Sequence, residues 1–336
     1  MSSARSRREI LEGLAGPRPV LELVRSAPKP EHGNVAILLS TYNGANYLPD
    51  QLHSFLAQTH HNWTLIWRDD GSTDNSTDLV RAFARESASG RCRFHDQSGS
   101  RQITRSFLSL LAAARQGSSD YFAFSDQDDV WLPDKLARGA TALAAVPQNQ
   151  PALYCARRIL VDHSLRRKGA PAPLHRHPGF PGALTQNVAP GCTMMLNRAA
   201  ADIVLASQPP ETIWHDWWCY VIVAAAGGRI LADPTPTVLY RQHDNNWVGE
   251  AASWWRRGYA ALRRGPGPFM RLLRSHVATL KNRPELLPER SRAQLAVIDQ
   301  ALDSHRLARV RALFLPGFTR GTWLETFVFW VWFILG

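Results

Sequence analysis

Three carboxylates lie within four residues in the segment Ser125-Asp126-Gln127-Asp128-Asp129. Such a cluster repels itself unless a cation neutralises it. Hard divalent cations take oxygen ligands and commonly keep water beside the phosphates of a substrate. A solvated acidic turn is the alternative, but apolar residues flank the cluster on both sides. The pattern therefore predicts a site for Mg²⁺ or Mn²⁺ together with a diphosphate.

A second pair of carboxylates, Asp69-Asp70, follows an apolar run and precedes the turn residues Gly71 and Ser72. A carboxylate in this position can accept hydrogen bonds from a nucleobase or a sugar. A turn that caps the following helix is the alternative, although capping needs only one of these side chains. The pair therefore favours a ligand-binding role and leaves the structural one open.

A third acidic position, Asp216, lies between Trp214 and Trp217 at the expected start of a helix. A carboxylate among aromatic side chains suits a general base, and an N-cap role is the competing interpretation. Further along the chain, His243 follows an expected strand. A single histidine there is commonly structural, but beside an acidic metal site it is a candidate extra ligand.

The elements that must position these residues follow from hydrophobic periodicity. From Val35 onward, short apolar runs that predict strands alternate with segments whose apolar residues recur at helical spacing. This order is typical of βαβ units and of a largely parallel sheet with helices on both faces. Ligands bind such sheets beyond the carboxyl ends of the strands, which is where the polar clusters fall. The expected strands are Val35–Ser40, Trp63–Trp67, Tyr121–Phe124, Leu153–Arg157, Gly191–Leu196 and Thr237–Tyr240, and the expected helices include Leu48–Gln58, Ile103–Ala114, Trp217–Ala226, Ser253–Arg264, Phe269–Leu280 and Arg290–Leu313.

Taken in order over about residues 35–250, these segments resemble family 2 glycosyltransferases of the GT-A fold. The Ser-Asp-Gln-Asp-Asp form, with His215–Trp218 and Tyr240–Asn246, is most similar to the bacterial rhamnosyltransferase-like branch. The fold class that this implies is α/β. It consists of a Rossmann-like, mixed and mostly parallel sheet flanked by helices, with a C-terminal helical extension.

The resemblance implies a donor site made by the first two strand ends. Thr41, Tyr42 and Asn43 would border the donor nucleotide, and Asp69 or Asp70 would hold the edge of its uracil or thymine base.

The resemblance also implies metal-binding and catalytic residues. Asp126 and Asp128 match the D-x-D motif of the family, with Asp128 as the direct metal ligand and Asp126 in support near the donor. Asp216 matches the acidic residue of the catalytic motif and would be the general base. His243 matches a late histidine that lies near the metal and the diphosphate in relatives.

The activity that follows from the resemblance is inverting, metal-dependent glycosyl transfer. The donor would be a nucleotide diphosphate sugar, either dTDP-rhamnose or a UDP-sugar. The acceptor would be a saccharide or a lipid-linked saccharide in cell-surface polysaccharide synthesis.

The positive charge of the chain is concentrated near its C-terminus. The sequence has 39 Lys and Arg against 28 Asp and Glu, a formal net charge of +11, and 14 of the basic residues but only four acidic ones lie in 251–320. We therefore divide the chain into a lead-in at 1–34, a GT-A domain at 35–250 and a basic, aromatic-rich helical region at 251–336. Basic helices with aromatic anchors are typical of membrane-surface elements.

These features predict a cytoplasmic enzyme that contacts the inner face of the cell membrane peripherally. The four cysteines form no C-x-x-C pair, which suits a reducing compartment, and no secretory signal is recognised. A helical subdomain packed on the catalytic core, or an interface between copies, is the alternative explanation for the C-terminal helices.

Two other classes of function remain as alternatives. A basic nucleic-acid-binding protein would explain the charge, but no such motif is present, so no nucleic-acid partner is expected. A sugar-nucleotide nucleotidyltransferase would need a glycine-rich loop with Arg or Lys after the first strand. The chain has Ser40-Thr41-Tyr42-Asn43-Gly44 there instead.

Overall fold

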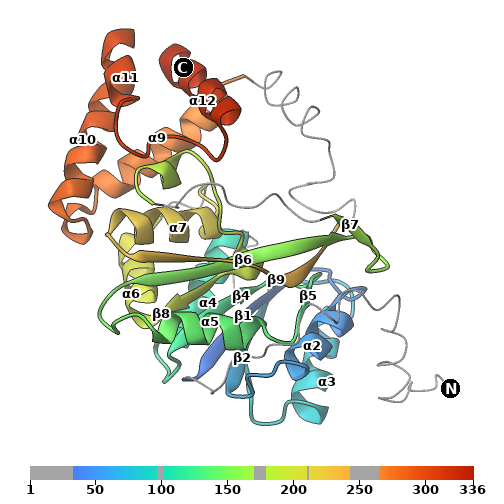
Figure 1. Cartoon of the computed structure of the whole chain (residues 1–336). Helices are drawn as coiled ribbons and strands as arrows, with labels where there is room; N and C mark the ends of the chain where they lie inside the picture. The colour runs from blue at the N-terminus through green and yellow to red at the C-terminus, as the bar shows by residue number, and fades with distance from the viewer. Residues whose placement is uncertain (1–32, 97–101, 170–178, 210–211, 243–264) are drawn as a thin grey trace.

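The structure is a computed structural model that describes residues 33–96, 102–169, 179–209, 212–242 and 265–336 (Figure 1). Its centre is one mixed sheet of nine strands in the order β3-β2-β1-β4-β8-β6-β9-β5, with β7 paired to β6. Neighbours among β3, β2, β1 and β4 run parallel, whereas β8 pairs antiparallel with both β4 and β6. The strands are β1 (Val35–Thr41), β2 (Trp63–Asp69), β3 (Cys92–Phe94), β4 (Tyr121–Ser125), β5 (Val130–Trp131), β6 (Ala152–Val161), β7 (Arg167–Gly169), β8 (Met195–Asn197) and β9 (Arg229–Arg241).

Helices cover both faces of this sheet (Figure 1). The helices are α2 (Leu48–Leu56), α3 (Ser76–Glu86), α4 (Ile103–Arg115), α5 (Lys135–Ala144), α6 (Arg198–Ser207), α7 (His215–Ala225), α9 (Gly267–Lys281), α10 (Glu289–Asp303), α11 (Arg306–Ala312) and α12 (Trp323–Leu335), with short 3₁₀ turns η2 (Gly182–Leu184), η3 (Gly191–Thr193) and η4 (Pro284–Leu286). The predicted α/β class with a helical extension is confirmed.

The central strand β1 shows why the sheet is covered on both sides. Its residues alternate between the two faces, because side chains in a strand have a period of two. Ala36 and Leu38 belong to the hydrophobic core shared with α4, α6 and α7. Ile37 and Leu39 belong to the core shared with α2, α3 and α5. A strand buried on both faces is a continuous apolar run, which is the signal that the sequence carries here.

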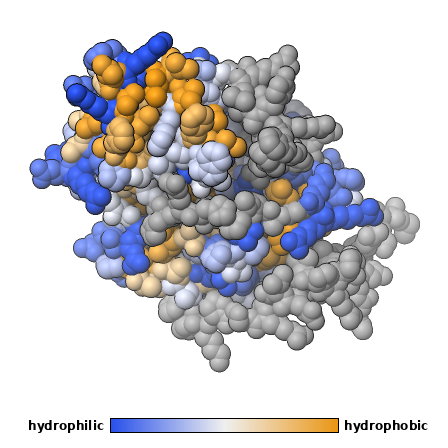
Figure 2. Space-filling view, turned by 45° about the horizontal axis from the view of Figure 1, so that its top comes forward, coloured by the Kyte–Doolittle hydropathy of each residue, from blue (hydrophilic) through white to orange (hydrophobic). Residues whose placement is uncertain are grey.

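The C-terminal helices continue the core on the side of α7. Helix α9 buries Met270, Leu273, Val277 and Leu280 at helical spacing in the same hydrophobic cluster as α7. The ring of His276 lies edge-on to Trp217, with centroids 5.2 Å apart. The C-terminal helices are therefore packed on the sheet domain through α9, and Figure 2 shows apolar residues gathered on their outer surface. No helix in the described part of the chain is long and apolar enough to cross a bilayer.

Two sequence predictions of secondary structure are wrong. Gly191–Leu196 is not one strand: Gly191–Thr193 forms the turn η3, and only Met195–Asn197 joins the sheet. The expected helix Arg290–Leu313 is two helices, because Ser304 and the next residue adopt extended backbone between α10 and α11. Serine competes for backbone hydrogen bonds and favours helix ends. The expected helix Ser253–Arg264 lies outside the described residues.

Candidate active site

Three polar segments meet at one edge of the sheet, as predicted. Strands β2, β1 and β4 are neighbours and run parallel, so their carboxyl ends, at Asp69, Thr41 and Ser125, lie side by side. This is the edge at which open α/β sheets bind ligands.

The loop after β1 is held by side chains from the loop after β2. Thr41 is buried and its hydroxyl donates to Asp69 Oδ1 at 2.8 Å. Asn43 has a left-handed backbone, with φ of 47°, and its side-chain oxygen accepts from the backbone N–H of Thr73. Tyr42 lies between them and is 48% exposed. Of the three residues expected to border the nucleotide, Tyr42 presents its ring to solvent and the other two fix the loop.

The two carboxylates after β2 have separate surroundings. Asp69 accepts hydrogen bonds from the backbone of Gly71 and Ser72 and so closes its own turn. Asp70 forms an ion pair of 2.8 Å with Arg68, and only 8% of its side chain is exposed. Ser40 also donates to Asp70, at 3.0 Å. Both carboxylates thus have structural hydrogen bonds, and recognition of a base by either one stays a prediction.

Gln127 joins the loop after β1 to the acidic loop after β4. Its amide oxygen accepts from the backbone N–H of Tyr42 at 2.8 Å, and its amide nitrogen donates to the carbonyl of Tyr42 at 2.9 Å. Gly44 packs so closely beneath this amide that an added Cβ would lie 2.2 Å from Gln127 Oε1. The D-x-D segment and the expected nucleotide loop are therefore one connected unit.

Replacing Gln127 by Ala should raise the KM for the nucleotide-sugar donor more than it lowers kcat. The variant removes both hydrogen bonds to Tyr42 and leaves the carboxylates in place. Loss of two such bonds corresponds to about 1–3 kcal/mol, or roughly five- to a hundredfold in KM. Steady-state kinetics with the donor varied would measure it, with Gln300→Ala on the exposed surface of α10 as control. An unchanged KM would contradict this role.

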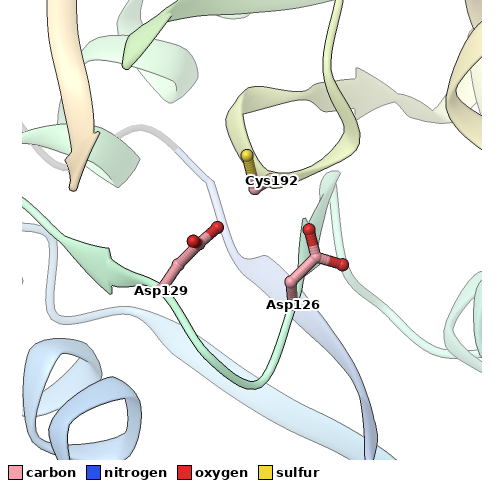
Figure 3. A group of neighbouring side chains, drawn as sticks. All are labelled: Asp126, Asp129 and Cys192. Carbon is pink, nitrogen blue, oxygen red and sulfur yellow. The ribbon is translucent and has the colours of Figure 1, made fainter. Parts of the chain in front are cut away.

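The acidic loop forms the centre of the site. Asp126, Asp129 and Cys192 each bring one potential ligand atom within 4.8 Å of the others (Figure 3). Burial, and the nearby charges of Asp128 and Asp216, raise the pKa of Asp126 to about 7. Asp129 is fully buried, and its Oδ2 has no hydrogen-bond partner among the described residues. Closely spaced carboxylates with an unsatisfied buried oxygen fit a hard divalent cation.

The thiol of Cys192 is not suited to bind such a cation. It comes from the turn η3, and burial raises the pKa of its thiol well above the usual range. A protonated thiol is a poor ligand for Mg²⁺ or Mn²⁺, which prefer oxygen. The residues of this group that fit a hard cation are therefore Asp126 and Asp129. The carboxylate of Asp128, the direct ligand expected from the sequence, is not part of the group, and its role as a ligand stays a prediction.

Arg241 anchors this loop to the end of β9. Its Nε donates to the carbonyl oxygen of Asp128 at 2.9 Å, and its backbone N–H donates to Asp129 Oδ1 at 3.2 Å. Its guanidinium also forms an ion pair of 2.8 Å with Asp50. The backbone of Asp128 is thus fixed by contacts that do not involve its own side chain. The expected extra ligand His243 follows two residues later and lies outside the described residues.

A buried cation lies beside the acidic cluster. The Lys135 side chain is completely buried at the start of α5, with its ammonium 3.8 Å from the centre of the Trp131 ring. No hydrogen-bond partner for this ammonium occurs within the described ranges. Burial lowers the pKa of Lys135 to about 7, while the negative charges of Asp129 and Asp126 act in the opposite direction. This positive charge offsets part of the repulsion among the carboxylates.

Asp216 lies in the first turn of α7, as the sequence predicts. Its Oδ1 accepts from the backbone N–H of Trp217 at 2.6 Å. Its Oδ2 accepts from Asn187 Nδ2 at 3.0 Å and from the backbone N–H of Gly191 at 3.2 Å. The ring of His215, the neighbour of Asp216 in α7, lies 5.2 Å from the ring of Phe124 in β4, so the structure brings the D-x-D loop and the start of α7 into one site. The turn η3 lies between them, contacting Asp216 through Gly191 and the acidic loop through Cys192.

Gly191 leaves no room for a larger residue. An added Cβ would lie 3.0 Å from Nε2 of the buried His215 and 3.3 Å from the Cβ of Asp216. If Asp216 is the general base that the sequence predicts, we expect Gly191→Ala to displace it by a few tenths of an ångström and to lower kcat by about tenfold or more, since small displacements of a catalytic group have large effects. Steady-state kinetics and a melting curve would measure it. Gly90→Ala is no suitable control because its φ is positive, whereas Gly179 has open space around it, so Gly179→Ala should retain full activity.

Comparison with known proteins identifies the family to which the chain belongs. Residues 36–202 match the family model described as glycosyl transferase family 2. The chain belongs to this family, and the match supports glycosyl transfer from a nucleotide-sugar donor as its activity.

The similarity to individual relatives covers different shares of the chain. The dTDP-rhamnosyl transferase RfbG of Shigella flexneri is 26% identical over 231 residues, which cover 64% of this chain and 75% of RfbG. The putative teichuronic acid biosynthesis glycosyltransferase TuaG of Bacillus subtilis is 29% identical over 104 residues, which cover 31% of this chain and 39% of TuaG. An uncharacterised glycosyltransferase of Nostoc is 38% identical over 104 residues, which are 31% of each chain. For the latter two, the similarity thus spans well under half of the relative.

A solved structure shares the fold. S. aureus TarS, residues 1–349, in complex with UDP-GlcNAc superposes with a TM-score of 0.56 and 14% sequence identity, over 80% of this chain and 72% of that one. At this identity the similarity concerns the fold.

Several residues of the site were not predicted from the sequence. Long-range hydrogen bonds join distant segments through Gln127, Asn187, Gly191 and Arg241. No local sequence pattern predicts such pairs. Asp129 belongs to the acidic cluster of the sequence, but only the fold of the loop shows that it lies beside Asp126 as a candidate ligand. One local feature of the sequence does indicate the turn η3. Pro190 before Gly191 is typical of a turn.

Proposed function

We propose that the protein is an inverting glycosyltransferase in which Asp216 is the general base and Asp126 and Asp128 hold Mg²⁺ or Mn²⁺. The observation that carries this proposal is the convergence of two acidic elements, the loop after β4 and the start of α7, at the carboxyl edge of the sheet, where the turn η3 contacts both. The donor diphosphate would lie against the first element and the acceptor hydroxyl against the second.

The surroundings of Asp216 support its role as the base. Three hydrogen bonds, from Trp217, Asn187 and Gly191, fix the orientation of its carboxylate. A carboxylate held in this way can take the proton from an acceptor hydroxyl while that hydroxyl attacks the anomeric carbon from the face opposite the diphosphate. Such general-base assistance contributes typically about 10²–10⁴-fold to the rate.

The acidic loop after β4 supports the proposal that a metal ion neutralises the negative charge of the leaving diphosphate. A divalent cation bound here would stabilise the negative charge of the departing diphosphate. The residues of the chain prepare this position: Arg241 fixes the backbone of Asp128, and the buried Lys135 limits repulsion while the cation is absent. Asp129 offers a further oxygen, which adds it to the ligands expected from the sequence.

For the substrates, we propose dTDP-rhamnose or a UDP-sugar as donor and a saccharide or lipid-linked saccharide as acceptor, in cell-surface polysaccharide synthesis. RfbG, which is named a dTDP-rhamnosyl transferase, supports the first donor, and the UDP-GlcNAc complex of TarS supports the second only through a shared fold. We place the enzyme in the cytoplasm, peripherally at the inner face of the cell membrane. The basic C-terminal region supports this location.

A thermal-shift screen against sugar nucleotides tests the proposed donor and metal together. The expected result is stabilisation by dTDP- or UDP-sugars that requires Mn²⁺ or Mg²⁺, since a ligand that binds only the folded state raises the melting temperature. GDP- and ADP-sugars serve as controls for the base. The absence of stabilisation by any nucleotide would contradict the proposal.

A further inference from the structure

Helix α12 has an apolar outer surface that no other part of the described chain covers. One face of the helix packs inward through Phe329 and Phe333, which are completely buried against Phe318 and its neighbours. The remaining face is mainly apolar, and its large exposed apolar residues, with the exposed fraction of each, are Trp323 (77%), Leu324 (41%), Phe327 (57%), Trp330 (36%), Val331 (36%) and Leu335 (61%). A helix that is apolar all round is normally buried on all sides.

The neighbouring helix adds to this surface. On α11 and just after it, Leu307, Val310 and Phe314 recur at helical spacing and are exposed, Leu307 by 69% and Phe314 by 82%. Arg309 joins the two helices by donating to the carbonyls of Phe333 and Ile334 at the end of α12. We call the exposed residues of both helices the α11–α12 face. Figure 2 shows this apolar surface at the top of the molecule, bordered by hydrophilic residues.

The charge around the face is mainly positive. From Ser304 to Leu335 the chain carries four arginines and one carboxylate, Glu325, which caps the start of α12 by accepting from Thr322. Arg306 and Arg311 are exposed on α11 beside Leu307 and Val310. Apolar and aromatic residues surrounded by arginines are suited to an interface that is apolar inside and anionic at its surface. A purely apolar protein partner would not need these charges.

We infer that the α11–α12 face is a membrane-docking surface that inserts its aromatic residues among the headgroups of an anionic bilayer. Helix α12 has 13 residues and is about 20 Å long, which is too short to cross a hydrocarbon core of about 30 Å but sufficient to lie in the interface. The inference deepens the proposed location at the membrane by naming the surface and its lipid chemistry. It does not depend on which sugar is transferred.

Flotation of the full-length protein with vesicles tests this inference. We expect binding to phosphatidylcholine vesicles that contain phosphatidylglycerol, and about tenfold or more weaker binding to pure phosphatidylcholine, since the arginines act on anionic lipid. The double variant Phe314→Ser/Phe327→Ser should lose binding by about tenfold or more, because it removes inserted apolar surface. The double variant Phe94→Ser/Val297→Ser, which changes exposed apolar residues outside the face, should bind as the unmodified protein does.

Two outcomes would overturn the inference. One is binding that does not depend on anionic lipid or on Phe314 and Phe327. The other is a dimer in lipid-free solution that Phe314→Ser/Phe327→Ser dissociates, which would assign the face to a second copy of the chain. Melting curves with dTDP or UDP and Mn²⁺ on the same samples show that each variant is folded. They also separate a failure of the docking surface, with nucleotide binding retained, from a failure of the proposed glycosyltransferase site.

Discussion

Asp216→Asn is expected to lower kcat by about 10²–10⁴-fold, the usual contribution of a general base. The amide cannot take the proton of the acceptor hydroxyl. The nucleotide should still bind, because the residues expected to contact it belong to the loops after β1, β2 and β4 and not to α7. The measurement is turnover with saturating donor and acceptor, paired with the dissociation constant of the nucleoside diphosphate.

The interpretation of this variant requires a stability control. Both carboxylate oxygens of Asp216 accept hydrogen bonds, and an amide can replace only one of them as an acceptor. A buried donor without its partner costs about 1–3 kcal/mol, so the variant should melt at a lower temperature. Asn187→Ala is a matched control, because it removes one of these hydrogen bonds and keeps the carboxylate. Near wild-type turnover by Asp216→Asn would refute the assignment of the base.

Asp128→Ala, and removal of divalent metal from the unmodified enzyme, are expected to abolish measurable transfer. Without the cation, the charge that develops on the departing diphosphate has no counterion. Mn²⁺ should restore activity to the EDTA-treated enzyme and should fail to restore it to Asp128→Ala. The variant keeps the hydrogen bond from Arg241, because Arg241 donates to the carbonyl oxygen of Asp128, and a melting curve checks that the variant is folded. Asp303→Ala, at an exposed surface position, is the matched control.

The pH dependence of metal binding adds a second test of the same site. Burial and the nearby carboxylates raise the pKa of Asp126 to about 7, so the metal-free protein carries a proton there below that pH. A cation must displace this proton, and its apparent affinity should therefore fall as the pH drops below about 7, by up to roughly tenfold per unit for one proton. Titration with Mn²⁺ at several pH values measures this. Activity in the absence of any divalent metal would contradict the metal-binding role.

The parts of the fold that could be predicted from the sequence are those with strong local signals. The strand β1 is an uninterrupted apolar run, and α4 has clear helical spacing, so both were located to within one residue at each end. The ends of β1, β2 and β4 are marked by polar clusters, which place Asp69 and Asp126 at strand ends, and Asp216 is correctly expected at the start of a helix.

The parts that could not be predicted depend on long-range contacts. The apolar residues of Gly191–Leu196 favour a strand. In the structure, Gly191 donates a hydrogen bond to Asp216 and packs on His215, and the chain forms a turn there. The link between Gln127 and Tyr42 spans 85 positions in the sequence. The packing of α9 on α7 likewise became visible only in the structure, and it shows that at least part of the basic C-terminal region serves the fold.

The most direct test of the account is the identity and configuration of the reaction products. With the donor selected by the thermal-shift screen and a suitable acceptor, the account predicts release of a nucleoside diphosphate and a glycoside whose anomeric configuration, read by proton NMR, is inverted relative to the donor. Release of pyrophosphate would indicate nucleotidyl transfer instead. A glycoside with retained configuration would contradict direct attack assisted by Asp216.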